Sequence, residues 1–427
     1  MTRLSKLTIY YLLSFLILTT VFFTNLFGIL NTNFEDFQKD SESLVIGKLA
    51  LSEREGIFYE SGLTGTYGTF IDTNQYDIYI NNKVASKENY TTYFSQIGGQ
   101  AILFSFLDKI SPFSNECNLM FFYLITAGLT SLIFTLFLKW VVQQFGLITS
   151  LITLILIISS YWIIIFSKNI WWSLWSFYLP FILLLRYFEK SRTIQLSLTK
   201  IGLFSSFLIF IKCFFTGYEY ITTTLIMFIM PVIFYSISDN WSFLKFLKIS
   251  SSAAFGAIIG IVMSLVVLLL QLSHLNSQKL NGWNYLMETF LRRSYDNPSK
   301  YLDPVYNQSM KSTVLDVLKI YFEGNQFVFK YHDLDLSVSF FQCICVLIIA
   351  TIFTLSKYKS KKTLGLTITL WVSILAPLSW FTIFKSHSFI HTHMNFIVWY
   401  MPFMLLGYVL IGNCVSYSLE KRKYNLK

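Results

Sequence analysis

Three of the five histidines in this 427-residue chain lie within seven residues, at His387, His391 and His393. Lys385 precedes them and adds a fixed positive charge. His387 and His391 are four residues apart and would share one face of a helix, whereas His391 and His393 would share one side of an extended turn. The cluster could ligate a metal ion, donate hydrogen bonds to a phosphate or diphosphate, or act as a general acid and base. The alternative is a set of polar side chains that closes a tight turn at a membrane surface.

A second group of ionisable residues is acidic and lies near the beginning of the chain. Glu35, Asp36, Asp40 and Glu42 follow closely on the first apolar segment. A carboxylate at a membrane surface could take a proton from a sugar hydroxyl, so that the oxygen attacks an activated anomeric carbon. It could also hold a divalent cation, Mg²⁺ or Mn²⁺, that neutralises a departing phosphate. The sequence establishes no metal site or cofactor, and the alternative role for these acids is capping and solvation of a surface helix.

Two further groups carry charge between apolar segments. Arg292 and Arg293 are adjacent and would point about 100° apart on a helix, so at most one of them faces a given site. Guanidinium groups are well suited to forked recognition of phosphate. Lys212 could bind the phosphate of a lipid carrier, and Glu219 could pair with it or bind sugar hydroxyls. Headgroup anchorage of the arginines and snorkelling of Lys212 are the alternatives that the sequence leaves open.

The elements that must position these residues are membrane spans. The chain is 54% hydrophobic and 13% charged, with a mean hydropathy of +0.55, whereas a soluble domain carries about 25% charged residues. A span needs about 20 apolar residues. We therefore expect an all-α polytopic membrane protein with about ten transmembrane helices, at 7–30, 117–138, 145–166, 170–187, 199–216, 219–237, 249–273, 336–356, 364–384 and 394–415.

The distribution of charge predicts the orientation of these spans. If both termini are cytoplasmic, that side receives 17 basic residues against three acidic ones, as the positive-inside rule requires. The opposite side is net acidic and holds every candidate residue described above. The net charge of +10 therefore reflects topology and attraction to anionic membrane lipids, and it gives no reason to expect a nucleic acid partner.

Two long segments on the non-cytoplasmic side divide the chain into five regions. These are a first anchor at 1–30, the first outer segment at 31–116, spans two to seven at 117–273, the second outer segment at 274–335, and three spans with a basic cytoplasmic tail at 336–427. Structureless loops of this length are uncommon, so both outer segments should be ordered and functional.

The first outer segment should contain interfacial helices. One is predicted to begin near Asp40 or Ser41, which could cap it, and to lie on the outer surface. Its apolar face is formed by Leu44, Val45, Leu49 and Leu51. A second interfacial helix is predicted at Gly98–Ile110, and the stretch Gly62–Asn82 reads as a loop or a short hairpin.

One span, the acidic motif Asp40-Ser41-Glu42, a helical stretch closed by Gly56 and then many spans together resemble the GT-C superfamily of membrane glycosyltransferases. The resemblance in layout covers the whole chain. The stretch Lys385-Ser-His387-Ser-Phe-Ile-His391-Thr-His393-Met-Asn395 also resembles a segment of uncharacterised bacterial membrane proteins of glycosyltransferase type. The GT-C resemblance implies that an acid of the first outer loop is catalytic, with Asp40 and Glu42 as the best match and Asp36 as a further candidate. It also implies that a basic residue of the later outer segment holds the carrier phosphate.

The sequence thus predicts an enzyme that moves a sugar from a polyprenyl-phosphate carrier to an acceptor hydroxyl on a glycan or lipid. The expected location is the cell membrane, with the active site on the non-cytoplasmic face and a role in cell-surface polysaccharide assembly or modification. The alternatives are a polysaccharide polymerase or ligase, and a transporter or flippase of lipid-linked glycans. The long acidic first outer segment speaks against the polymerase, and the absence of a mid-span acid speaks against the transporter.

Overall fold

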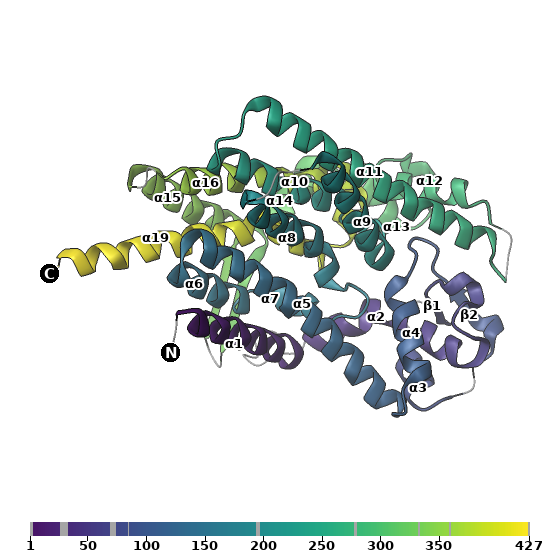
Figure 1. Ribbon diagram of the computed structural model, residues 1–427. Coiled ribbons are helices and arrows are strands. Elements are labelled where there is room, and N and C mark those ends of the chain that lie inside the picture. The colour runs from purple at the N-terminus through teal and green to yellow at the C-terminus, as the bar shows by residue number, and fades with distance from the viewer. Residues whose placement is uncertain are drawn as a thin grey trace.

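The computed structural model describes residues 3–25, 33–68, 74–83, 85–193, 197–276, 280–331, 334–357 and 360–425. The described chain is overwhelmingly helical, as the apolar runs predict (Figure 1). Eight of its helices are long and apolar enough to cross a membrane: Lys6–Thr24 of α1 (Arg3–Thr24), α5 (Asn115–Phe145), α9 (Leu198–Thr216), α10 (Ile221–Ser238), α11 (Phe243–Ser273), α15 (Phe340–Lys357), the pair α16 (Lys361–Ser373) and α17 (Leu375–Ile383), and Phe403–Lys421 of α19 (Phe403–Asn425). The chain is an all-α polytopic membrane protein.

The third and fourth predicted spans differ from simple straight helices. The third is a bent pair, α6 (Leu147–Ile158) and α7 (Tyr161–Ser167), with an angle of 71° between them. Ser160 lies at the break, where its hydroxyl donates to the Leu156 carbonyl and bonds the Tyr408 hydroxyl at 2.7 Å, so side chains satisfy the interrupted backbone. The fourth is α8 (Leu174–Lys190), which has only 17 residues because the chain before it forms a turn.

The first outer segment is folded around a helix that is buried rather than superficial. α2 (Asn33–Glu55) begins well before Asp40 and Ser41, so neither residue caps it. Residues 41–52 are buried, which contradicts the expectation of a helix on the outer surface. Gly56 follows the last residue of α2 with φ of +93°, and its N–H bonds the Ser52 carbonyl, which confirms it as the residue that closes the helix.

The remaining elements of this segment pack around α2. α4 (Gly99–Ile110) confirms the second predicted helix. The expected loop or hairpin at Gly62–Asn82 is wrong in part: α3 (Asn74–Ile80) is helical, and β1 (Gly65–Tyr67) pairs antiparallel with the more distant β2 (Tyr90–Thr92). The alternation of Tyr76, Ile78 and Ile80 misled the prediction because it is too short to separate a strand from one helical turn.

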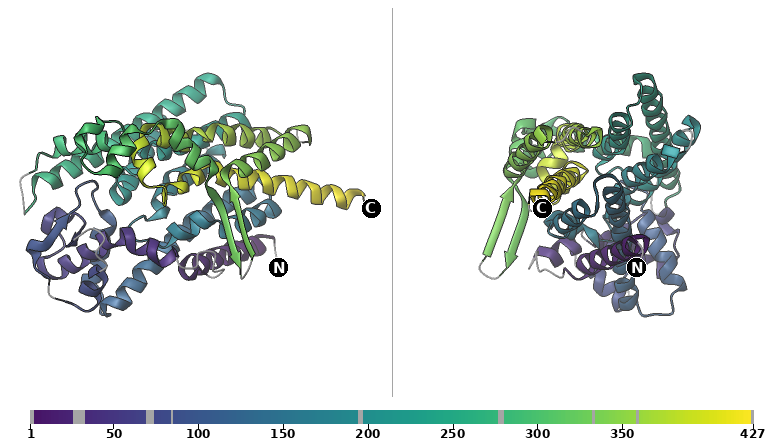
Figure 2. Two further views of the ribbon diagram at one scale, coloured as in Figure 1. Left: turned by 180° about the vertical axis from the view of Figure 1, so that it is seen from behind. Right: turned by 60° about the vertical axis from the view of Figure 1, so that its left-hand side comes forward.

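The second outer segment contains three helices, α12 (Gly282–Arg293), α13 (Pro304–Lys311) and α14 (Val314–Glu323). They are followed by an antiparallel hairpin, β3 (Asn325–Tyr331) and β4 (Leu334–Ser339), that projects from the side of the helix bundle (Figure 2). The strand β4 occupies the start of the eighth predicted span, which begins instead at α15. Likewise the predicted span 394–415 is helical only from Phe403, after the short helix α18 (Lys385–Ile390) and a 3₁₀ segment at Asn395–Tyr400.

The elements are arranged lengthwise, with both termini towards one end of the molecule and the first outer segment, α12 and α13 towards the other (Figure 1). Between these ends α9 and α11 pack very closely. A side chain on Gly256 would collide with the Gly202 backbone, and one on Gly260 would lie 2.5 Å from the Ser206 carbonyl oxygen. Small residues four apart are typical of closely packed membrane helices, and here they allow the close approach of α9 and α11.

Candidate functional site

A cavity of about 330 Å³, lined by both polar and apolar side chains, lies where the two outer segments meet the ends of the spans. Seven separate parts of the chain contribute to it, namely α2, the segment after β2, the α7–α8 turn, the α9–α10 turn, α12, α13, and α18 with the residues that follow it. The lining residues are Ser41, Leu44, Tyr93, Ser95, Trp171, Trp172, Glu219, Arg292, Arg293, Tyr306, His387, Ile390, His391, His393 and Met394. The predicted Glu219, both arginines and all three histidines of the cluster thus come together in one cavity.

Glu219 organises one wall of this cavity from the turn between α9 and α10. Its Oε1 accepts from Nη1 of Arg293 at 2.5 Å, and its Oε2 lies 3.5 Å from Nε2 of His387. The second terminal nitrogen of Arg293 donates to the Tyr93 hydroxyl at 3.0 Å. Glu219 therefore connects the first outer segment, the second outer segment and α18.

The Glu219 carboxylate is ionised despite its burial. Burial by itself raises its pKa, but Arg293 and His387 outweigh burial and leave the pKa below its ordinary value. Burial also lowers the pKa of His387, although Glu219 opposes that shift. The result is a buried Arg–Glu ion pair beside a histidine whose pKa lies below its ordinary value.

The histidines form a row along the cavity. The rings of His387 and His391 are 4.3 Å apart at their centroids, and those of His391 and His393 are 5.7 Å apart. Burial, His387 and His393 lower the pKa of His391 to about 2. Its Nδ1 has no hydrogen-bond partner among the described residues, so a neutral imidazole is available to a ligand.

The two predicted lysines do not line the cavity. Lys212 is fully buried, and its ammonium donates to the carbonyl oxygens of Gly217 at 2.8 Å and Glu219 at 2.5 Å. Lys385 donates to the carbonyl oxygens of Met310 at 2.9 Å and Ser312 at 2.6 Å. Each lysine thus satisfies carbonyl groups where the chain leaves a helix. Lys212 holds the turn that presents Glu219, and Lys385 attaches α18 to the end of α13.

Glu42 lies behind the cavity wall rather than in it. Its side chain is fully buried, where Oε1 accepts from the Ile170 N–H at 3.0 Å and Oε2 accepts from the hydroxyls of Tyr76 at 3.0 Å and Tyr123 at 2.9 Å. Burial, partly offset by these hydrogen bonds, raises its pKa to about 7. Both oxygens are occupied, so Glu42 positions the α7–α8 turn and does not face the cavity from which a substrate would approach.

The other two predicted acids cannot be placed in the same way. The side chains of Asp36 and Asp40 lie outside the part of the chain whose side chains are described. The backbone places Asp40 inside α2, directly before Ser41 and one turn before Leu44, and both of these neighbours line the cavity.

Sequence reasoning missed the aromatic wall of the cavity. Trp171 and Trp172 were assigned to the start of a span, but they lie in the turn before α8, where Oδ1 of Asn169 accepts from both backbone N–H groups at 3.0 and 2.9 Å. Trp172 is 4% exposed and stacks on Tyr220 at 5.7 Å, and its indole N–H has no acceptor among the described residues. The sequence signal was the polar Lys168-Asn169 pair at the boundary of the apolar run. Tyr93, Ser95 and Tyr306 left no comparable signal.

The arrangement is suited to binding an anion beside a ring-shaped, partly apolar group. Arg292, which has no ion pair within the described residues, and the imidazoles supply donors, and the tryptophans and tyrosines supply flat apolar surface. Among the described residues no three His, Cys, Asp or Glu side chains are grouped so that they could hold a metal ion. No protein-family model, curated protein or solved structure matches the chain.

Proposed function

We propose that this protein is a membrane glycosyltransferase that moves a sugar from a polyprenyl-phosphate carrier to an acceptor hydroxyl on a glycan or lipid. One observation carries the proposal: a single cavity gathers two arginines, three histidines and two tryptophans next to the α2 segment that contains Asp40. A sugar phosphate needs such a combination of donors and aromatic surface.

In this proposal Arg292 and His391 bind the phosphate that links the sugar to its carrier. Arg293 is held by Glu219 and Tyr93, so its charge contributes at a fixed position and needs no rearrangement during the reaction. Trp172 donates its indole N–H, for which the described residues offer no acceptor, to the sugar or the phosphate. The role of the basic groups is to stabilise negative charge as the phosphate leaves.

Asp40 is the proposed base. It accepts the proton of the acceptor hydroxyl while that oxygen forms a bond to the anomeric carbon, and the bond from that carbon to the phosphate oxygen breaks. The electron pair stays with the polyprenyl phosphate, which departs as an anion. Glu42 supports this step from behind by fixing the α7–α8 turn. No nucleotide takes part.

The reaction is proposed to occur on the non-cytoplasmic face of the cell membrane. The basis is the positive-inside distribution of charge together with the location of the cavity. It lies between the outer segments, at the ends of α9 and α10 that meet at Glu219.

The test is sugar transfer by the purified protein in lipid nanodiscs. A panel of short-chain polyprenyl-phosphate sugars is supplied with membrane glycans as acceptors, and the release of polyprenyl phosphate is measured by mass spectrometry. Asp40→Asn should reduce release by at least about 100-fold, the scale of general-base catalysis, whereas the exposed Glu88→Gln should match the unmodified protein. Full activity of Asp40→Asn, or movement of the intact donor across the bilayer without release, would overturn the proposal.

A further inference from the structure

A second and larger cavity, of about 720 Å³, lies at the other end of the spans. It is formed where α8 ends, where α9 and α11 begin and where α10 ends. We call it the basal groove, and its polar lining consists of Ser191, Arg192, Asp239, Ser242, Lys245 and Lys248. Its apolar wall includes Leu198 and Leu244, which are 41% and 60% exposed.

The basal groove and the candidate active site lie at opposite ends of the same two helices. α9 runs from Leu198, which lines the groove, to Thr216, three residues before Glu219. α10 returns from Ile221 to Ser238, directly before Asp239. Helices of 19 and 18 residues extend about 28 and 27 Å, close to the roughly 30 Å thickness of the bilayer core. The groove therefore lies at the level of the lipid headgroups of the other leaflet.

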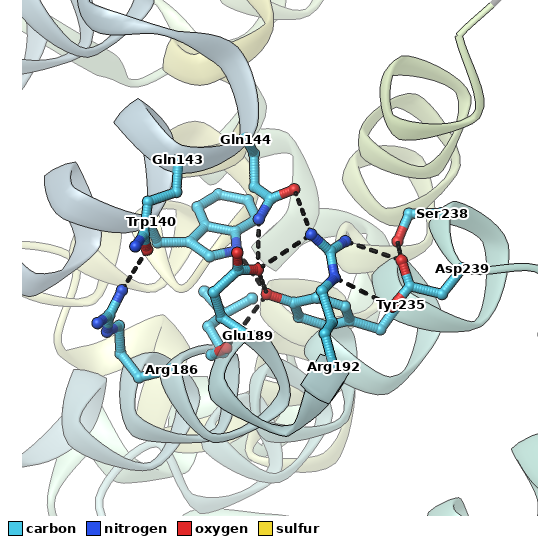
Figure 3. Close-up of polar contacts among 10 residues, drawn as sticks. Trp140, Gln143, Gln144, Arg186, Glu189, Arg192, Tyr235, Ser238 and Asp239 are labelled. Atoms are coloured by element: carbon cyan, nitrogen blue, oxygen red, sulfur yellow. Dashed lines mark hydrogen bonds and ion pairs between the residues drawn. The ribbon is translucent and has the colours of Figure 1, made fainter. Parts of the chain in front are cut away.

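Arg192, which lines the groove, lies at the centre of a network of polar contacts (Figure 3). Nε and Nη2 of Arg192 donate to the two carboxylate oxygens of Asp239 at 3.2 and 2.8 Å, and Nη1 lies 3.3 Å from Glu189. Glu189 in turn accepts from the hydroxyl of Tyr235 at 2.8 Å. Since Arg192 faces two carboxylates, its charge is already matched and is not the group that attracts an additional anion.

The lysines of the groove differ from Arg192 in their ion pairing. Lys245 and Lys248 are one turn apart at the start of α11, and neither makes an ion pair among the residues that the structure describes. Lys245 lies 4.7 Å from the centre of the Trp241 ring, which holds its ammonium at the groove. The groove thus presents, beside exposed leucines, two positive charges that have no ion-pair partner in the described part of the chain.

We propose that the basal groove binds the phosphate headgroup of an anionic membrane lipid, with its acyl chains against the exposed leucines. Basic pockets between transmembrane helices recognise such headgroups, and charge complementarity with Lys245 and Lys248 selects an anionic over a zwitterionic lipid. Arg192 and Asp239 shape the floor and bring the ends of α8 and α10 together. This site is separate from the proposed sugar transfer.

The test compares the thermal unfolding of the purified protein in phosphatidylcholine nanodiscs with and without phosphatidylglycerol. The lipid should raise the unfolding temperature of the unmodified protein. In Lys245→Gln/Lys248→Gln the apparent affinity should fall about fivefold per lysine, since each contributes about 1 kcal/mol near an anionic surface. The matched control is Lys361→Gln/Lys362→Gln, which removes two adjacent lysines from the start of α16 and should retain the full response.

Several outcomes would overturn the proposal. The unmodified protein could show no preference for phosphatidylglycerol, or the control variant could lose as much of the response as the groove variant. Soluble glycerol phosphate could also stabilise the protein as much as the lipid does. Stabilisation by polyprenyl phosphate alone would also overturn the proposal, because the groove would then hold a carrier and not a membrane phospholipid. If the double variant does not fold, the single variant Lys248→Gln replaces it, and its apparent affinity for phosphatidylglycerol should fall about fivefold.

Discussion

Arg293 and Glu219 are 74 positions apart in the chain, yet their side chains form an ion pair with an N–O distance of 2.5 Å at the wall of one cavity. The pair attaches the second outer segment to the turn between two membrane spans. Because it is largely buried and also bonded to Tyr93 and His387, it fixes the cavity before any ligand arrives.

Breaking this ion pair should lower the free energy of unfolding, and the effects of the two single substitutions should not add up in the double variant. Glu219→Gln or Arg293→Gln alone leaves a buried charge without its partner, so each should destabilise the protein by about 3–5 kcal/mol. The double variant should cost clearly less than the sum of the two. Thermal unfolding in one detergent measures all three, with Glu88→Gln as the neutral control. Strict additivity would mean that the two residues do not act as a pair.

Trp172→Phe should separate ligand binding from stability. Phenylalanine keeps a ring that can stack on Tyr220 but removes the indole N–H, which has no acceptor among the described side chains and backbone groups. The KM for the sugar donor should rise about fivefold to tenfold, the value of one hydrogen bond, while kcat and the unfolding temperature change little. An unchanged KM with a lower unfolding temperature would assign the tryptophan to packing alone.

Glu42 should make stability depend on pH in a recognisable direction. Its folded pKa of about 7 exceeds the unfolded value near 4.5, so the folded state holds a proton that the unfolded state releases. Glu42 therefore stabilises the folded state at acid pH. This stabilisation, roughly 3 kcal/mol in the free energy of unfolding, is lost as the pH rises from about 4.5 through 7.

Glu42→Gln should remove that slope, because the amide resembles the protonated acid. Unfolding temperatures of the variant and the unmodified protein should diverge between pH 5 and 8, with the variant more stable at the upper end. Other titrating groups, such as Glu53, are common to both proteins and cancel in the difference. Parallel curves across this range would show that Glu42 is already ionised at acid pH.

Lys212 should matter for stability as well as for activity. Lys212→Met removes two ammonium–carbonyl hydrogen bonds from a buried turn, which should cost about 2–4 kcal/mol and lower donor turnover by displacing Glu219. The matched control is Lys200→Met, near the exposed beginning of the same helix. Loss of donor binding with unchanged stability would instead indicate that Lys212 contacts the phosphate.

The sequence was informative where it depended on apolar length and charge. The long spans and the helix α4 follow from those signals, whereas the Glu219 carboxylate, expected to pair with Lys212 or to bind sugar hydroxyls, forms its ion pair with Arg293. The sequence was uninformative about which neighbouring groups a charged side chain contacts. Lys212 and Lys385 resemble anion-binding lysines in sequence, but nearby carbonyl groups at helix ends are closer acceptors.

Local interruptions were equally hard to foresee. At the 71° bend between α6 and α7, Ser160 bonds the hydroxyl of Tyr408, which is 248 residues away, and no local pattern reveals such a contact. The burial of α2 similarly depends on packing by later elements. Glu42 looked like a surface acid because its partners Tyr123 and Ile170 lie far along the chain.

The most direct test of a shared site is a cryo-electron microscopy structure of Asp40→Asn with a polyprenyl-phosphate sugar. The predicted result is phosphate density within hydrogen-bonding distance of Arg292 or His391, with the sugar against Trp172 and its anomeric carbon facing residue 40. Phosphate density in the basal groove at Lys245 and Lys248, with the cavity between Glu219 and His391 lacking any, would contradict the account.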